Sequence, residues 1–214
     1  MATAEQDAAL KTGLSFSYRV YRGAPQGRTF ILLHGSGVDE TTLPPLARDV
    51  SPDATLIAVR GRIVQDDSRR WFTRITPTRF DQKSIREEAA SFAVFVREAA
   101  AVEGFDVKDA VFLGYSNGAN LLSSVMLLHP GIVYRAALLR AMPVLDEVPP
   151  TRLDTSEILV IAGAADETYG PYAPALAALL TEHGAKVQSF MAAAGHEFGA
   201  SDAERIRKWL APAA

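Results

Sequence analysis

AVFLGYSNGANLL, residues 110–122, begins with a strand-like pattern and ends with a helix-like pattern. Its first four residues are apolar and favour a buried β-strand, whereas residues 118–128 repeat apolar side chains at helical spacing. Between them, Gly114-Tyr115-Ser116-Asn117-Gly118 fits the pattern Gly-X-Ser-X-Gly in the strand–turn–helix setting that this motif requires. Such a turn exposes the Ser116 hydroxyl and directs helix N–H groups toward the same point. We therefore predict that Ser116 is a nucleophile. The alternative is a glycine-rich turn in which Ser116 only caps the helix.

Other short apolar runs predict the remaining strands of one sheet. They are Phe16–Arg22, Thr29–Leu33, Leu56–Val59, Ala136–Leu139, Ile158–Ala162 and the more polar Val187–Met191. Several are apolar at consecutive positions, which is typical of strands covered by helices on both faces of a parallel sheet. The connection Gly23–Gly27 has the length of a hairpin turn, so we expect the sheet to begin antiparallel. A capping box at Ser84–Glu87 predicts the start of a long helix.

Length and composition limit the function classes. The 214 residues, 48% hydrophobic and 22% charged, predict one domain over 1–214, with residues 1–13 as a loose N-terminal segment. A net charge of −3 gives no general attraction to nucleic acid. The absence of cysteine excludes disulfides, thiolate metal ligands and a cysteine nucleophile. No segment has the length of a membrane span, so we expect a cytoplasmic protein without membrane insertion.

The acid that a serine nucleophile requires has one well-placed candidate. Asp166 follows the strand Ile158–Ala162, and open α/β sheets carry functional groups beyond the carboxyl ends of their strands. Glu167 is the nearest alternative, and Asp146 is less well placed after an earlier strand. Asp166 could also be a solvated loop carboxylate.

The base is predicted at His196, which lies after the last strand and before the last helix. With Ser116 and Asp166 it gives the chain order nucleophile, acid, histidine. His196 would accept the serine proton while Asp166 orients the imidazole. The alternative is a surface-loop histidine.

An oxyanion hole is predicted from backbone N–H groups of Ser36 and Asn117. Ser36 lies in the glycine-rich turn His34–Gly37 at the end of strand Thr29–Leu33, and Asn117 follows the nucleophile. We interpret His34 as a structural residue that holds this turn.

These motifs together resemble the α/β-hydrolase superfamily, and more narrowly its small carboxylesterase/phospholipase group. The resemblance runs from about Phe16 to Leu210 and rests on Leu33–Glu40, Val59–Gly61, Gly114–Asn120, Gly163–Asp166 and Gly195–Glu197. It implies a three-layer sandwich with a mostly parallel sheet of about seven strands. It also implies hydrolysis of carboxylic esters by Ser116, Asp166 and His196, without a metal or other cofactor. Acyl-protein thioesterases usually carry Gln where this chain has Asn117, and dienelactone hydrolases use a cysteine, which this chain lacks.

The length leaves no room for a cap domain, so we expect small to medium esters as substrates, cleaved through an acyl-enzyme on Ser116. Trp71, Phe72 and Met142 are candidate pocket residues, and packing of a long loop on the core is the alternative for the two aromatic residues. Five arginines and two aspartates lie between positions 60 and 74: Arg60, Arg62, Arg69, Arg70, Arg74, Asp66 and Asp67. They could attract an anionic ester, but we favour a structural role in which they bond loop carbonyls and pair with the aspartates.

Two other functions stay open at this point. A thioesterase or lysophospholipase would act on longer acyl chains, and a non-catalytic homologue would only bind a ligand. The family resemblance also suggests a homodimer, by analogy alone.

Overall fold

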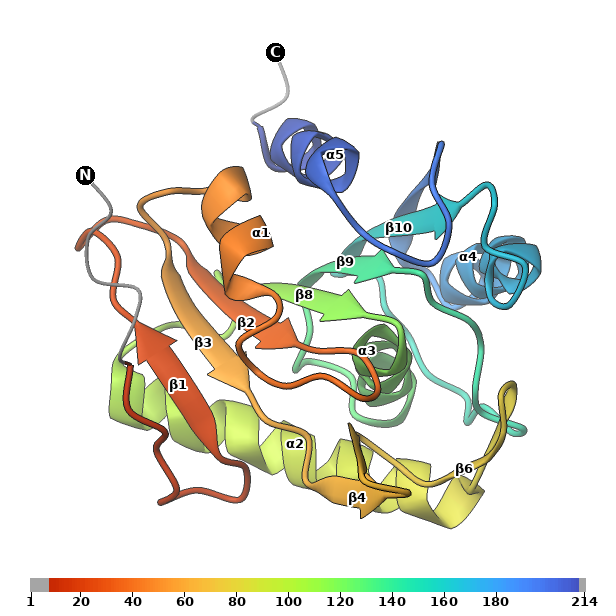
Figure 1. The fold of residues 1–214 in the computed structure, drawn as a ribbon, viewed down its shortest axis with the longest axis horizontal. Coiled ribbons are helices and arrows are strands. Elements are labelled where there is room, and N and C mark those ends of the chain that lie inside the picture. The colour runs from red at the N-terminus through yellow and green to blue at the C-terminus, as the bar shows by residue number, and fades with distance from the viewer. Residues whose placement is uncertain (1–7, 212–214) are drawn as a thin grey trace.

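A computed structural model describes residues 8–211. Its centre is a seven-stranded sheet with the strand order β1-β3-β2-β8-β9-β10-β11 (Figure 1). The strands are β1 (Tyr18–Tyr21), β2 (Thr29–Leu33), β3 (Thr55–Val59), β8 (Val111–Tyr115), β9 (Arg135–Leu139), β10 (Glu157–Gly163) and β11 (Lys186–Ala192). All pair in parallel except β1. Each of the seven predicted strands is present, and the mostly parallel sheet is confirmed.

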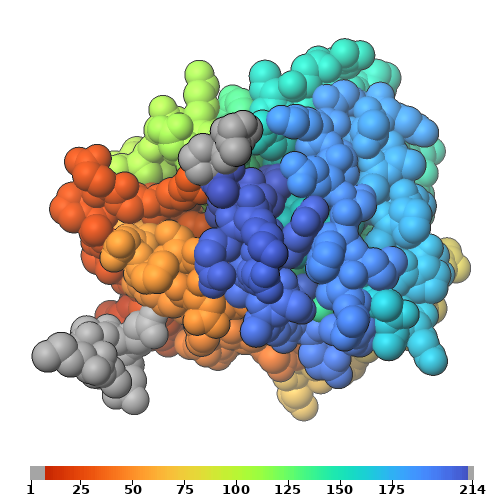
Figure 2. All heavy atoms as spheres, turned by 90° about the horizontal axis from the view of Figure 1, so that it is seen from above, coloured from red at the N-terminus to blue at the C-terminus, as the bar shows by residue number. Residues whose placement is uncertain are grey.

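Helices cover both faces of this sheet. One outer layer holds α1 (Pro44–Val50) and α5 (Ala200–Leu210), and the other holds α2 (Gln82–Glu103), α3 (Asn117–Leu128) and α4 (Ala173–Glu182). Figure 2 shows the surfaces of α1 and α5 side by side above the sheet. The three-layer sandwich is therefore the observed architecture.

The strands divide the hydrophobic core into two halves. In β2, Ile31 and Leu33 pack toward α2 and α3, while Phe30 and Leu32 pack toward α1 and α5. This alternation follows from the two-residue period of a strand. Because both faces are buried, the inner strands are apolar at consecutive positions after their first residues, which explains why their sequences do not alternate between apolar and polar residues.

The first strand has a different partner from the one expected. β1 is antiparallel, but it pairs with β3, in the register Tyr18 with Val59 to Tyr21 with Leu56, and not with β2. The connection after β1 is bound to the end of the neighbouring strand, since Ala24 N–H donates to the Asp53 carbonyl at 2.9 Å. The connection is as short as a hairpin turn, but it leads from β1 past β3 to β2. It therefore does not form a β-hairpin.

The segment between β3 and α2 folds into two small hairpins. They are β4 (Ile63–Gln65) with β5 (Ser68–Arg70), and β6 (Arg74–Thr76) with β7 (Arg79–Phe80). Asp66 and Asp67 form the first turn with φ of 50° and 54°, the positive values that a tight two-residue hairpin turn requires. These hairpins are the main addition to the sandwich, and residues 8–211 contain no cap domain.

Two local predictions need correction or completion. Helix α2 begins at Gln82, before the predicted capping box, because Asp81 caps it by accepting from Ser84 N–H at 2.6 Å. Residues 1–7 of the predicted loose segment lie outside the described residues, and Lys11 forms an ion pair with Glu103 at 2.7 Å. Among residues 8–211, no helix combines the length and apolar character needed to span a bilayer.

Candidate active site

The turn between β8 and α3 holds Ser116 in a strained backbone conformation. Its φ of 51° and ψ of −116° lie outside the regions that residues with a side chain usually adopt. The turn is fixed on one side by Ser116 N–H, which donates to the Leu139 carbonyl at 2.8 Å. On the other side, a Cβ atom at Gly118 would lie 2.3 Å from the Leu33 carbonyl oxygen, so only glycine fits. The turn thus has the form that the sequence motif predicted.

Three side chains from separate loops meet at this turn. Nε2 of His196 lies 3.0 Å from Oγ of Ser116, and Nδ1 of His196 lies 2.8 Å from Oδ2 of Asp166. The three residues follow β8, β10 and β11, so they gather beyond the carboxyl ends of parallel strands. The structure therefore brings together the three residues that the sequence selected, while Glu167 and Asp146 are not part of this hydrogen-bonded line.

Asp166 divides its two oxygens between the backbone and the histidine. Oδ1 accepts from the N–H groups of Thr168 and Tyr169 at 3.1 and 3.0 Å, which leaves Oδ2 for His196. Burial raises the pKa of this carboxyl, but the hydrogen bonds from Tyr169 N–H and from His196 outweigh it and hold the pKa below its ordinary value. The carboxylate is thus kept ionised beside the imidazole although it is only 4% exposed.

The turn after β2 lies close to the serine, since a Cβ atom at Gly35 would lie 3.6 Å from Cβ of Ser116. The N–H groups of Ser36 and Asn117 have no acceptor within residues 8–211. His34 holds the turn in place, because its Nε2 accepts from Gly61 N–H at 3.0 Å and its Nδ1 lies 2.7 Å from the Gly35 carbonyl. Burial lowers the pKa of His34, which keeps the ring neutral and suited to accept one bond and donate the other. This arrangement agrees with the structural role predicted for His34.

Comparisons of sequence and of structure with known proteins both indicate the same family. The crystal structure of a carboxylesterase from Mesorhizobium loti is 58% identical, covers 96% of this chain and 99% of its own, and superposes with a TM-score of 0.92. A Bacillus cereus carboxylesterase is 26% identical over 91% of this chain and 92% of its own, with a TM-score of 0.86. MhqD, a Bacillus subtilis protein named as a hydrolase, is 30% identical over 200 residues, which are 89% of this chain and 96% of MhqD. No protein-family model matches the chain.

The chain belongs to the carboxylesterase group of the α/β-hydrolases. The family expected from the motifs is thereby confirmed, and the esterase is a hydrolase of carboxylic esters. The match with the Mesorhizobium loti carboxylesterase covers nearly all of both chains, so the family assignment applies to the whole sandwich.

A buried arginine, which the sequence analysis did not select, supports the histidine loop of the esterase. Arg140 directly follows β9 and adopts a left-handed φ of 52°. Its guanidinium donates to the carbonyls of Gly195 at 2.9 Å and Glu197 at 2.7 Å, the residues on either side of His196. It also forms a bidentate pair with Asp202 of α5 at 2.8 and 3.1 Å. Its signal in the sequence was a single charge placed directly after the buried strand Ala136–Leu139.

Two aromatic residues expected at a pocket wall lie in the core of the esterase instead. Trp71 and Phe72 are both 0% exposed. The Trp71 indole packs on the His34 ring and donates from Nε1 to the His34 carbonyl at 2.8 Å. Trp71 therefore supports the turn after β2, whereas Phe72 packs on Phe80 of β7, because the hairpin segment turns these aromatic side chains into the core. Met142 is also buried, at 4% exposure, and its N–H donates to Asn120 Oδ1.

Asn117 has a structural contact that the sequence analysis did not predict. Its Oδ1 accepts from Trp71 N–H at 2.8 Å. This bond ties the arginine-rich segment of the esterase directly to the residue after Ser116.

Three of the five arginines in that segment have structural partners. Arg60 pairs with Glu40 at 2.5 Å, Arg62 pairs with Glu88 at 2.7 Å, and Arg69 donates to the Gly61 carbonyl at 2.9 Å. The predicted structural role is right for these three. The prediction that the arginines pair with Asp66 and Asp67 is wrong. Within the described residues these aspartates form no ion pair, and they form the β4–β5 turn instead.

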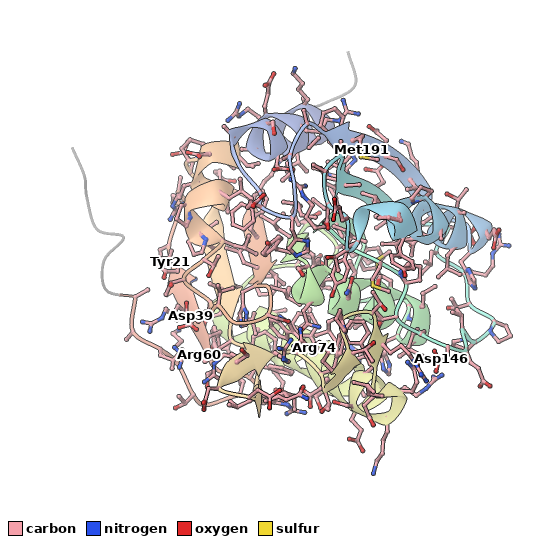
Figure 3. All side chains as sticks on the ribbon, turned by 45° about the vertical axis from the view of Figure 1, so that its right-hand side comes forward. Tyr21, Asp39, Arg60, Arg74, Asp146 and Met191 are labelled. Carbon is pink, nitrogen blue, oxygen red and sulfur yellow. The ribbon has the colours of Figure 1, made fainter. Side chains whose placement is uncertain are left out.

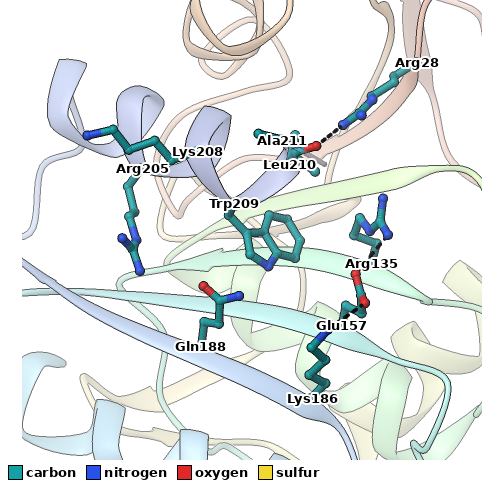
Figure 4. A pocket seen from close by; sticks show the side chains of 10 residues that line it. All are labelled: Arg28, Arg135, Glu157, Lys186, Gln188, Arg205, Lys208, Trp209, Leu210 and Ala211. Carbon is teal, nitrogen blue, oxygen red and sulfur yellow. Dashed lines mark hydrogen bonds and ion pairs between the residues drawn. The ribbon is translucent and has the colours of Figure 1, made fainter. Parts of the chain in front are cut away.

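A basic hollow lies on the opposite edge of the esterase. It has a volume of about 480 Å³ and lies at the first residues of β9, β10 and β11, whereas Ser116, Asp166 and His196 follow the last residues of their strands (Figure 4). In it, Glu157 pairs with Arg135 and Lys186, and Arg28 donates to the Leu210 carbonyl. The hollow is therefore separate from the candidate active site.

Proposed function

We propose that Ser116, His196 and Asp166 are the catalytic triad of this esterase. The observation that carries the proposal is the unbroken line of hydrogen bonds from Asp166 through His196 to the Ser116 hydroxyl. In this line Nδ1–H of His196 donates to the carboxylate, so Nε2 is free to accept the serine proton. The left-handed backbone of Ser116 agrees with a nucleophile held on a sharp turn.

The reaction proceeds in two halves. Oγ of Ser116 attacks the ester carbonyl as Nε2 of His196 takes its proton, and the collapse of the tetrahedral intermediate returns that proton to the departing alcohol. Water then attacks the acyl-enzyme with His196 again as the base, which releases the carboxylic acid and restores Ser116. The ionised Asp166 stabilises the imidazolium in both halves.

The oxyanion hole in this proposal consists of the N–H groups of Ser36 and Asn117. Both are free of acceptors within the described part of the chain, and Asn117 is the first residue of α3, where N–H groups have no partner inside the helix. The helix N-terminus adds a favourable dipole for the negative oxygen. Removing one such donor lowers turnover by roughly 10²–10³-fold in comparable enzymes.

The proposed substrates are esters of small to medium size. The observation behind this is the absence of a cap among residues 8–211, since only the two short hairpins between β3 and α2 rise beyond the sandwich. The substrate is a small molecule, whereas a cytoplasmic location and a homodimer stay predictions. Size-exclusion chromatography with light scattering measures the oligomeric state.

The proposal is tested by covalent labelling and by a series of esters. A fluorophosphonate should modify Ser116, mapped by mass spectrometry, and Ser116→Ala should lower kcat/KM by at least about 10³-fold. Ser124→Ala is the matched control, because Ser124 is a buried serine on α3 that only donates to the Asn120 carbonyl. Among p-nitrophenyl esters, kcat/KM should be highest for short acyl chains. Labelling at another residue would contradict the nucleophile, and a rate that rises up to long acyl chains would favour the thioesterase or lysophospholipase alternative.

A further inference from the structure

One buried arginine of the hairpin segment has no hydrogen-bond or ion-pair partner among residues 8–211. Arg70, the last residue of β5, is 4% exposed. Its Nε is buried without a hydrogen bond, and its two terminal nitrogens keep access to solvent without an acceptor from the described chain. Arginine is almost never buried without pairing, because removing an unpaired charge from water is costly. The buried cation of Arg70 therefore requires an explanation.

Arg70 lies next to the proposed catalytic residues. The following residue, Trp71, donates its N–H to the side chain of Asn117, the residue after Ser116. The preceding carbonyl, that of Arg69, accepts from Gly37 N–H at 2.9 Å in the turn that carries Ser36. The strand β5 is thus fastened on both sides of Arg70 to the two loops of the proposed oxyanion hole.

Tyr169 joins the hairpin segment to the proposed triad. The centroids of its ring and of the His196 ring are 5.2 Å apart in an edge-on arrangement, and its hydroxyl donates to the Pro77 carbonyl at 3.3 Å. Burial raises the pKa of Tyr169, and the positive charges of Arg74 and Arg70 act against that rise. Tyr169 therefore connects the turn between β6 and β7 with His196.

The charges around Arg70 leave its positive charge in excess. Arg74 and Asp66 are the charged groups that act on it, one of each sign, together with the Tyr169 hydroxyl. Asp66 is exposed on the β4–β5 turn and does not come within ion-pair distance of Arg70 among the described contacts. Figure 3 shows Arg74 on the β6 side of the segment and Arg60 at its other end. Arg60 is neutralised by Glu40, whereas Arg70 and Arg74 form no ion pair with any side chain of residues 8–211.

We propose that Arg70, assisted by Arg74, binds a carboxylate group of the substrate, so that the esterase prefers anionic esters over neutral ones of the same shape. This inference rests on the proposed function, because the ester carbonyl of the same molecule must reach Ser116. A guanidinium matches the two oxygens of a carboxylate in a bidentate geometry, and the bond is strong where water is excluded. The reaction is the hydrolysis described above: water and the anionic ester give an alcohol and an acid, and the recognised carboxylate is unchanged.

The test uses two pairs of esters in which a carboxylate replaces a methyl group. Monoethyl glutarate and ethyl pentanoate place the difference in the acyl part, and 4-acetoxybenzoate and 4-methylphenyl acetate place it in the alcohol part. The readout is the ratio of kcat/KM for the anionic ester to kcat/KM for its neutral partner. In Arg70→Met this ratio should fall by about 10- to 100-fold in at least one pair, since hydrogen bonds between charged groups are worth that much in a site protected from water.

Further variants separate a specific site from a general effect of charge. Arg79→Met removes the same charge from an exposed arginine of the neighbouring hairpin and should change the ratio by less than about threefold. Arg70→Lys keeps the charge without the planar fork and should give an intermediate ratio. Arg74→Met should have a smaller effect than Arg70→Met, because Arg74 is exposed.

Binding of glutarate to Ser116→Ala, measured by calorimetry, tests the anion site without turnover. Loss of this binding when Arg70→Met is added supports the proposal even if both ester pairs are poor substrates. If neither ratio nor glutarate binding responds to Arg70→Met, the anion site is overturned. The proposed function would still stand in that case, provided that neutral esters are hydrolysed in a manner that depends on Ser116. Loss of that dependence would instead overturn the proposed function.

Discussion

Arg140 and Arg70 are both buried and both lie beside the proposed active site, but their surroundings are opposite. Arg140 is 1% exposed, pairs with Asp202 through two hydrogen bonds and donates to the carbonyls on either side of His196. Arg70 is 4% exposed and has no acceptor in the described part of the chain. The guanidinium of Arg140 thus completes a hydrogen-bond network within the protein, whereas the guanidinium of Arg70 lacks acceptors among the described residues.

This difference separates a positioning role from a binding role. A buried cation whose hydrogen bonds are all made by the protein fixes the groups around it, as Arg140 fixes the loop of His196. Arg70 makes no hydrogen bond that could fix a neighbouring group of the described chain, and in our proposal a carboxylate that enters the site supplies its acceptors. Variants at the two positions should therefore differ strongly in their effect on stability, with a large loss at Arg140 and little or no loss at Arg70.

The largest effect is expected for Arg140→Met. The change leaves Asp202 as a buried carboxylate without a counter-charge, held only by the Gly199 N–H, and releases two carbonyls, so the free energy of unfolding should fall by about 3–5 kcal/mol. Urea unfolding followed by circular dichroism measures this loss. Arg79→Met, at an exposed arginine, is the control and should stay within about 0.5 kcal/mol of the parent.

The double variant Arg140→Met/Asp202→Leu sharpens the same prediction. Replacing both charges with apolar groups should recover much of the lost stability, because no unpaired charge is then buried. Ester hydrolysis should stay low, since the carbonyls of Gly195 and Glu197 still lack the donors that hold the His196 loop. Full recovery of activity would mean that Arg140 acts only on the charge of Asp202.

An intermediate effect is expected at a third arginine site, where Arg60 and Arg19 surround Glu40. Burial raises the pKa of Glu40, but hydrogen bonds from Arg60 and Arg19 lower it to about 2. Because the folded pKa is depressed, this carboxylate stabilises the fold above about pH 4.5, and the contribution is lost as the pH falls toward about 2. Glu40→Gln should lower the free energy of unfolding at pH 7 by roughly 2–3 kcal/mol.

The same variant should flatten the dependence of stability on pH across that acid range. Urea unfolding at a series of pH values measures the slope. Glu87→Gln, at an exposed glutamate of α2, should leave the slope unchanged. An identical slope in Glu40→Gln and the parent would show that the pair with Arg60 does not contribute in the folded state.

The smallest effect on stability is expected for Arg70→Met. Removing a buried cation that has no partner costs no hydrogen bond, so the free energy of unfolding should stay within about 1 kcal/mol of the parent or rise. The measurement is the same urea unfolding as for Arg140→Met. A loss as large as that of Arg140→Met would reveal a structural role for Arg70 and remove the contrast between the two arginines.

The sequence was sufficient for the strands and for the residues that meet at Ser116. Buried parallel strands produce consecutive apolar runs, and functional groups lie in the loops after them, so Asp166 and His196 could be selected by position alone. The pairing of β1 could not be predicted in this way. A hairpin-length connection is compatible with either neighbour, and the choice of β3 depends on a contact with Asp53 from outside the hairpin.

The roles of the arginines and of Trp71 were beyond sequence reasoning for a different reason. Their functions depend on which residues distant in the chain lie opposite them: Asp202 for Arg140, Glu40 for Arg60 and the His34 carbonyl for Trp71. A composition of five arginines and two aspartates suggested local neutralisation, but the structure pairs two of those arginines, Arg60 and Arg62, with acids outside the segment. Only the complete set of contacts reveals that the Arg70 side chain has no ion pair or hydrogen bond within the described residues.

The bond between Arg140 and Asp202 has a consequence for the order in which the active site is assembled during synthesis. Asp202 is in the first turn of α5, the last helix of the described chain, whereas Arg140 and Ser116 emerge from the ribosome much earlier. Until α5 emerges, the guanidinium lacks its counter-charge and the loop of His196 lacks its anchor. A nascent chain would therefore carry the proposed nucleophile Ser116 well before the proposed triad is complete, and we expect hydrolytic activity to begin only when the final helix docks.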